Sequence, residues 1–227
     1  MSGFFTPETF RFLNELAANN RRDWFERNRS RYEDAVRTPA LDFIAAMAPR
    51  LAAISPHFSA IPRRQGGSLM RVFRDTRFSR DKSPYKTNIG IHFRHEAGRD
   101  VHAPGFYVHI APEEAFLAAG IWHPDAPALA RIRTELARYP KRWLAARDDV
   151  AFARSFELSG DSLVRVPRGF DATHPMAEDL RRKDFIGICP MLPGSVIEAD
   201  FADFAAERFA DGAPLMRFLC RALGQAY

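Results

Sequence analysis

The sequence predicts an α+β fold in which an antiparallel β-meander in the centre is covered by N-terminal and C-terminal helices. Apolar residues recur at helical spacing near both ends of the chain, whereas the stretch between residues 88 and 122 alternates in steps of two. The predicted strands are joined by segments too short to hold the crossover helix of a parallel sheet. We therefore expect neighbouring strands to run antiparallel.

Helix signals open the chain. Thr6-Pro7-Glu8 supplies a capping residue, a first-turn proline and an early acid. Asp23 and Glu26 resemble a capping box for a second helix, and Thr38-Pro39 restarts a third. Three short helices are thus predicted before any strand.

The middle of the chain changes to the period of a strand. Leu69 to Phe73 is compatible with a strand, Asn88 to His95 and Gly105 to Ala111 alternate more clearly, and Ala115 to Trp122 follows a turn. The alternation predicts one apolar face and one polar face, the latter carrying His92, Arg94, Tyr107 and His109.

Helical spacing then returns. One stripe ends at Pro140, a further helical stretch runs from Trp143 towards Phe156, and a loop rich in Gly and Pro covers residues 160–175. Two amphipathic stripes separated by Gly212 and Pro214 close the chain.

Size and composition favour a single globular domain spanning residues 1–227. The chain is 46% hydrophobic and 27% charged, and its 20 phenylalanines supply large apolar surfaces for a core. Two cysteines, Cys189 after a predicted strand and Cys220 in a helical pattern, are too few for a disulfide framework, so we expect reduced thiols and a cytoplasmic location. No stretch approaches the roughly 20 apolar residues that cross a bilayer, which predicts no membrane partner.

The positive charge is concentrated in one segment. Residues 63–99 carry ten Arg and Lys against three acids, a net charge of +7 in a chain whose total is +5. Such a segment attracts phosphates, nucleic acid or acidic small molecules, although arginines are also consumed in internal ion pairs.

The densest part of this segment, residues 71–88, joins two predicted strands. Its guanidinium and ammonium groups recur about every three residues and could converge on an anion. The candidate anion-binding residues are Arg71, Arg74, Arg77, Arg80, Lys82 and Lys86. The structural alternative is that Asp75 and Asp81 pair with these bases and hold a long loop on the sheet, while Phe78 and Tyr85 fill the core.

The same run resembles the bacterial and fungal domain of unknown function 2461 family. Further similarity to that family lies in Asn19 to Asn28 with Tyr32, Gly105 to His109, Gly120 to Pro124, Pro167 to Asp171 and His174-Pro175. The resemblance spans nearly the whole chain and implies one intact domain. The resemblance implies no particular activity for this chain.

The histidines suggest two kinds of chemistry. His92 and His109 are expected on one sheet face, and either could act as general acid or base beside a bound anion, with Tyr107 nearby. His95, His102 and His123 are close in sequence, but none of the histidines has a recognisable zinc spacing, so we predict no bound metal. The sequence identifies no cofactor.

The sequence contains none of the complete catalytic motifs that we considered. Ser79-Arg80-Asp81-Lys82 matches S-x-x-K formally, but the partner motifs of penicillin-recognising enzymes are missing. Phosphate-cradling, dinucleotide-binding and nucleophile-elbow motifs are absent from the sequence.

Three classes of function therefore stay open, and the sequence leaves open both whether the protein is an enzyme and its oligomeric state. The favoured class is an enzyme or binding protein for a phosphorylated or carboxylated small molecule. The second is a nucleic-acid-associated module that uses the same basic segment, in which the aromatic residues between the arginines stack on the nucleobases of a single strand. The third is a non-enzymatic protein whose Arg/Asp network is structural.

Overall fold

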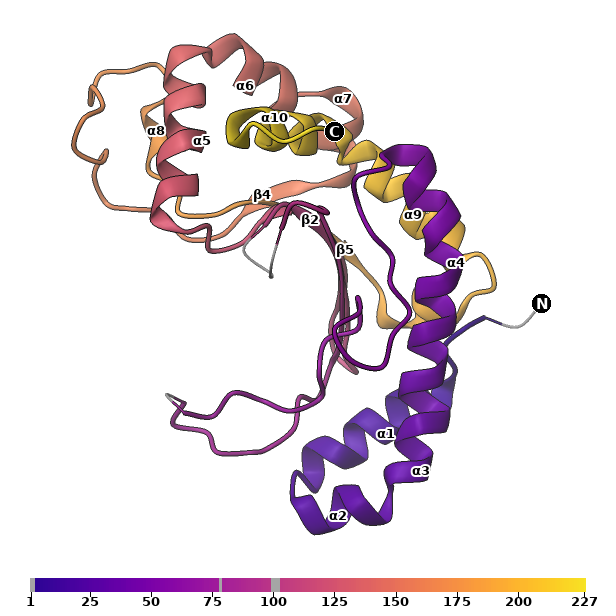
Figure 1. The fold of residues 1–227 in the computed structure, drawn as a ribbon. Helices are drawn as coiled ribbons and strands as arrows, with labels where there is room; N and C mark the ends of the chain where they lie inside the picture. The colour runs from indigo at the N-terminus through magenta and orange to yellow at the C-terminus, as the bar shows by residue number, and fades with distance from the viewer. Residues whose placement is uncertain (1–2, 78, 99–102) are drawn as a thin grey trace.

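The computed structural model describes residues 3–77, 79–98 and 103–227 and has a curved antiparallel sheet with helices packed on one side (Figure 1). The strand order is β1-β2-β3-β5-β4, and each pairing is antiparallel. The strands are β1 (Ile89–Arg94), β2 (Gly105–Ile110), β3 (Ala115–Ile121), β4 (Glu157–Ser159) and β5 (Phe185–Met191). The predicted α+β class with a central antiparallel sheet is confirmed.

The N-terminal helices are more continuous than the sequence suggests. They are α1 (Pro7–Ala18), α2 (Arg22–Arg27), α3 (Arg29–Tyr32), the π-helical turn η1 (Glu33–Arg37) and α4 (Thr38–Ile54). Helix α1 begins as predicted after Thr6. The capping box predicted at Asp23 is wrong, because α2 already begins at Arg22 and Asp23 lies in its first turn. The predicted restart at Thr38 is also wrong, since η1 joins α3 to α4 without leaving helical backbone.

The later helices surround the second half of the sheet. They are α5 (Ala126–Arg138), α6 (Pro140–Arg147), α7 (Val150–Ser155), α8 (Ala177–Leu180), the 3-10 turn η2 (Pro193–Ile197), α9 (Phe201–Asp211) and α10 (Ala213–Leu223). The single stretch predicted from Trp143 is two helices, because the Asp149 carboxylate accepts from the N–H groups of Ala151 and Phe152 and starts α7 anew.

Two expectations about strands need correction. Leu69 to Phe73 is not a strand, and only single bridges join Leu69 to Ile91 and Phe73 to Tyr85. A strand was expected to end before Cys189, but β5 continues to Met191 and Cys189 lies inside it. Gly187 and Pro190 interrupt the apolar residues of β5, which weakens the sequence signal for the full strand.

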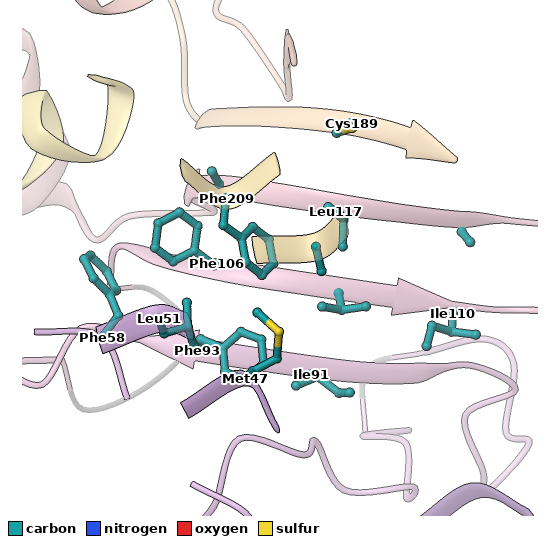
Figure 2. Close-up of a cluster of buried hydrophobic side chains, with 14 of the residues drawn as sticks. Met47, Leu51, Phe58, Ile91, Phe93, Phe106, Ile110, Leu117, Cys189 and Phe209 are labelled. Carbon is teal, nitrogen blue, oxygen red and sulfur yellow. The ribbon is translucent and has the colours of Figure 1, made fainter. Parts of the chain in front are cut away.

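The hydrophobic core lies on one face of the sheet. Ile91 and Phe93 of β1, Phe106 of β2 and Leu117 of β3 are fully buried. Figure 2 shows them in one layer with Met47 and Leu51 of α4 and Phe209 of α9. The helices α4, α9 and α10 contact the sheet from this side. The predicted apolar face is therefore the covered face. Within the described residues, none of the helices combines the length and the apolar character that crossing a bilayer requires.

One position in β3 should tolerate only glycine. Gly120 has a φ of +139°, and a Cβ there would overlap the carbonyl oxygen of Phe185 on the neighbouring strand. We expect Gly120→Ala to lower the free energy of unfolding by about 3 kcal/mol, because both the backbone strain and the strand separation must change. Chemical denaturation measures this loss. Gly194→Ala is the control, since nothing lies within 4 Å of its added Cβ, and an equal loss in both variants would contradict the argument.

Candidate ligand-binding site

The face of the sheet opposite the core carries a hollow, which we call the trough. Its volume is about 290 Å³. In Figure 1, α4 and α9 lie on the other side of the curved sheet, while the magenta loop that carries the basic segment projects on the trough's side. Side chains from four strands line the trough, so it follows directly from the period-two alternation of the strands.

Small residues form the floor of the trough. Gly105 pairs with Gly120, and Ala118 pairs with Tyr107 in the next row of the same face. A Cβ on Gly105 would overlap His92 Nε2, and a Cβ on Gly90 would lie 2.7 Å from the Tyr107 hydroxyl. The glycines therefore give the His92 and Tyr107 side chains room to lie across neighbouring strands.

Aromatic residues form one wall. The His109 ring stacks on Phe116 with centroids 4.6 Å apart and planes 4° apart. The Tyr107 hydroxyl lies 3.4 Å from His109 Nδ1, and His109 Nε2 lies 3.5 Å from a carboxylate oxygen of Glu114. Trp122, which is half exposed, closes another side.

Burial determines the protonation of this wall. It raises the pKa of Tyr107 to about 12, so the hydroxyl keeps its proton and can donate. Burial also lowers the pKa of His109, against the smaller opposing effect of Glu114. At neutral pH the wall therefore presents a phenol and a neutral imidazole. The three predicted catalytic candidates His92, Tyr107 and His109 do lie together, because all three line the trough.

A second hollow adjoins the trough, and we call it the basic cavity. The two share Met70 and His92 as lining residues, and the basic cavity has a volume of about 400 Å³. Its cationic side chains are Arg71 and Lys86 from the basic segment and Arg94 from β1, and none of the three forms an ion pair with another described residue. Asp75 also lines it, but both Asp75 carboxylate oxygens accept from Arg77, at 3.0 and 2.7 Å.

Lys86 is partly buried in this cavity. Burial, and to a smaller extent the charge of Arg71, lower the pKa of its ammonium group. A partly buried cation without an acidic partner is costly, and a bound anion would offset that cost.

Two other arginines of the basic segment, Arg74 and Arg77, form ion pairs with Asp81 and Asp75, the acids named in the structural alternative. Arg74 pairs with Asp81 and also donates to Ser83 Oγ at 2.9 Å. Lys82 donates to the carbonyl of Thr76 at 2.8 Å, and Arg80 is exposed. Tyr85 stacks on Phe25 in the core as expected, whereas Phe78 and His102 lie outside the described residues. Of the six predicted anion-binding residues, only Arg71 and Lys86 line the basic cavity, and Arg94, which was not among the six, lines it with them.

A His–Asp pair that was not predicted lies beside the trough. Asp184 is 1% exposed and accepts from the His123 main-chain N–H at 2.7 Å, from His123 Nδ1 at 2.8 Å and from the Asp161 N–H at 2.9 Å. His123 has a φ of 47°, and its ring stacks on Trp122. The carboxylate thus holds the turn that positions Trp122 at the trough. No sequence signal links residues 123 and 184, because the contact depends on the pairing of β3 with β5.

Metal ligands are not gathered in the described part of the chain. No group of three or more His, Cys, Asp or Glu side chains is placed there to hold an ion.

The Asp184 contacts predict an order of stabilities. Asp184→Asn leaves a main-chain N–H facing an amide donor, so we expect it to lower the free energy of unfolding by about 3 kcal/mol. His123→Ala keeps both main-chain hydrogen bonds and should lower it by only about 1 kcal/mol. Urea titrations of the two variants test this, and equal losses would show that the main-chain bonds contribute nothing.

The lowered pKa of His109 predicts an acid-sensitive fold. The unfolded chain, with its ordinary histidine pKa of about 6.5, binds a proton more readily than the folded chain. Stability should therefore be unaffected above that pH and fall as the pH drops below it. His109→Phe should flatten this fall in melts between pH 7.5 and pH 5. An unchanged slope would contradict a buried neutral imidazole.

Comparison with known proteins adds the family. The family model described as conserved hypothetical protein (DUF2461) matches residues 8–218. No curated protein and no solved structure matches the chain. The match includes every strand, the trough and the basic cavity, and the chain therefore belongs to the DUF2461 family of conserved hypothetical proteins.

Proposed function

We propose that this protein binds a small organic anion with an apolar body. The acid group lies in the basic cavity against Arg71, Lys86 and Arg94, and the body lies in the trough. The observation that carries the proposal is the unpaired, partly buried Lys86 beside two further cations that pair with no described acid.

The two hollows suit the two parts of such a ligand. Arginine donates planar paired hydrogen bonds that fit a carboxylate or a phosphate. The trough offers Phe116, Trp122, Ile186 and Ile188 as apolar surface, with Tyr107 and His109 as polar groups that fix orientation. Because Met70 and His92 border both hollows, one ligand can contact both.

The nucleic-acid alternative has less support. A nucleic-acid interface requires arginine and lysine side chains spread along an open surface. Arg74, Arg77 and Lys82 instead form ion pairs or hydrogen bonds within the loop that carries them. We also propose a reducing cytoplasmic location, since Cys189 and Cys220 are both buried free thiols.

Binding of 3-phenylpropionate tests the proposal. We expect it to bind more tightly than the neutral 3-phenylpropanol or the shorter propionate, because each of these lacks one half of the interaction. Lys86→Gln and Arg71→Gln should each weaken binding about tenfold, which corresponds to about 1.4 kcal/mol. Isothermal titration calorimetry measures the affinities.

Two exposed residues of the same segment provide controls. Arg80→Gln and Lys82→Gln remove charge outside the basic cavity and should leave the affinity within about twofold. Equal binding of the alcohol and the acid would contradict the proposal. Strongly salt-dependent binding of single-stranded DNA that weakens in Arg77→Ala and Arg80→Ala would favour the nucleic-acid alternative.

A further inference from the structure

The chain uses lysine rarely. Its 33 basic side chains include four lysines, Lys82, Lys86, Lys141 and Lys183, and the other basic residues are arginine. Lys82, Lys141 and Lys183 are exposed, whereas Lys86 is partly buried. The one lysine withdrawn from solvent therefore lies in the basic cavity, beside two arginines.

An arginine at this place would supply charge equally well, and it would supply more hydrogen-bond donors. What arginine cannot supply is a neutral amine, because its guanidinium stays protonated in proteins. A lysine that is partly removed from water, next to another cation and without an acid, is the arrangement that activates an amine as a nucleophile. The lowered pKa of Lys86 agrees with this arrangement.

We propose that Lys86 forms a reversible imine with a 2-oxo acid that carries an apolar side chain. This inference rests on the proposed function, because the same cavity must first hold the acid group. The carboxylate lies against Arg71 and Arg94, the neighbouring ketone faces Lys86, and the side chain extends past Met70 into the trough.

The step balances without a further reactant. The lone pair of the neutral Lys86 Nζ attacks the C2 carbonyl carbon, forming a C–N bond while the carbonyl π electrons move to oxygen. Transfer of the nitrogen's proton to that oxygen gives a carbinolamine. The proton that remains on the nitrogen is then transferred to the hydroxyl, which leaves as water while the C=N bond forms. His92 borders both hollows and is positioned to carry protons between nitrogen and oxygen.

The charges around Lys86 define its expected pH dependence. Arg71, Asp75, His92 and Arg94 face it from the basic segment and β1, and Tyr32 borders it from the helical side. Burial and the charge of Arg71 favour the neutral amine, whereas Asp75 is bound to Arg77. Imine formation at Lys86 should therefore be appreciable at a lower pH than at an ordinary lysine.

Reductive trapping tests the inference. The intact protein is incubated with phenylpyruvate and sodium cyanoborohydride at pH 7, and peptide mapping by mass spectrometry locates the reduced imine. We expect modification at Lys86 at least tenfold faster than at Lys82, Lys141 or Lys183, which serve as controls within the same molecule. Modification spread evenly over the four lysines would overturn the proposal.

Two further measurements separate this inference from the proposed function. Lys86→Arg keeps the positive charge, so it should still bind 3-phenylpropionate but lose the fast trapping. Arg71→Gln should slow trapping at Lys86 while leaving the exposed lysines unchanged. If wild-type protein binds 3-phenylpropionate but traps no phenylpyruvate at Lys86, the imine is wrong and the binding site stands. If neither ligand binds, both proposals fail.

Discussion

One-sided coverage of the sheet is the constraint on which the rest of the molecule depends. Helices α4, α9 and α10 bury the face that carries Phe93, Phe106 and Leu117. Since side chains alternate across a strand, each residue next to these positions must point to the opposite face. Within the described parts of the chain no helical layer covers that face, so its side chains can line a hollow.

The trough exists because small residues occupy the central positions of the uncovered sheet face. Gly105, Ala118 and Gly120 leave the floor low, while Tyr107, His109 and Phe116 rise beside it. The same glycines accommodate rings from neighbouring strands, since a Cβ at Gly105 would collide with His92. Packing on the core side and space on the open side are thus both consequences of one alternating pattern.

The basic side chains of the segment differ in what they contact. Arg74, Arg77 and Lys82 bond within their own loop, to Asp81, Asp75 and the Thr76 carbonyl, and their exposed pairs contribute little stability. Arg71 and Lys86 instead point to the cavity that Arg94 completes. The internal ion pairs that the sequence suggested are formed by Arg74 and Arg77, whereas the anion site proposed above would use Arg71, Lys86 and Arg94.

The sequence by itself determined the fold class, the strands β1 to β3 and the grouping of His92, Tyr107 and His109, because all of these follow from local period and short connections. It also located the basic segment. The sequence could not determine which arginine and lysine side chains of that segment lack an ion pair. Asp75 and Asp81 are near several of these side chains in sequence, and only the folded loop selects the partner of each acid. The full extent of strand β5, the Asp184–His123 contact and the addition of Arg94 to Arg71 and Lys86 were likewise decided by the tertiary structure. Each of these features depends on contacts between segments far apart in the chain, and such contacts form only when the strands pair and the helices pack on the sheet.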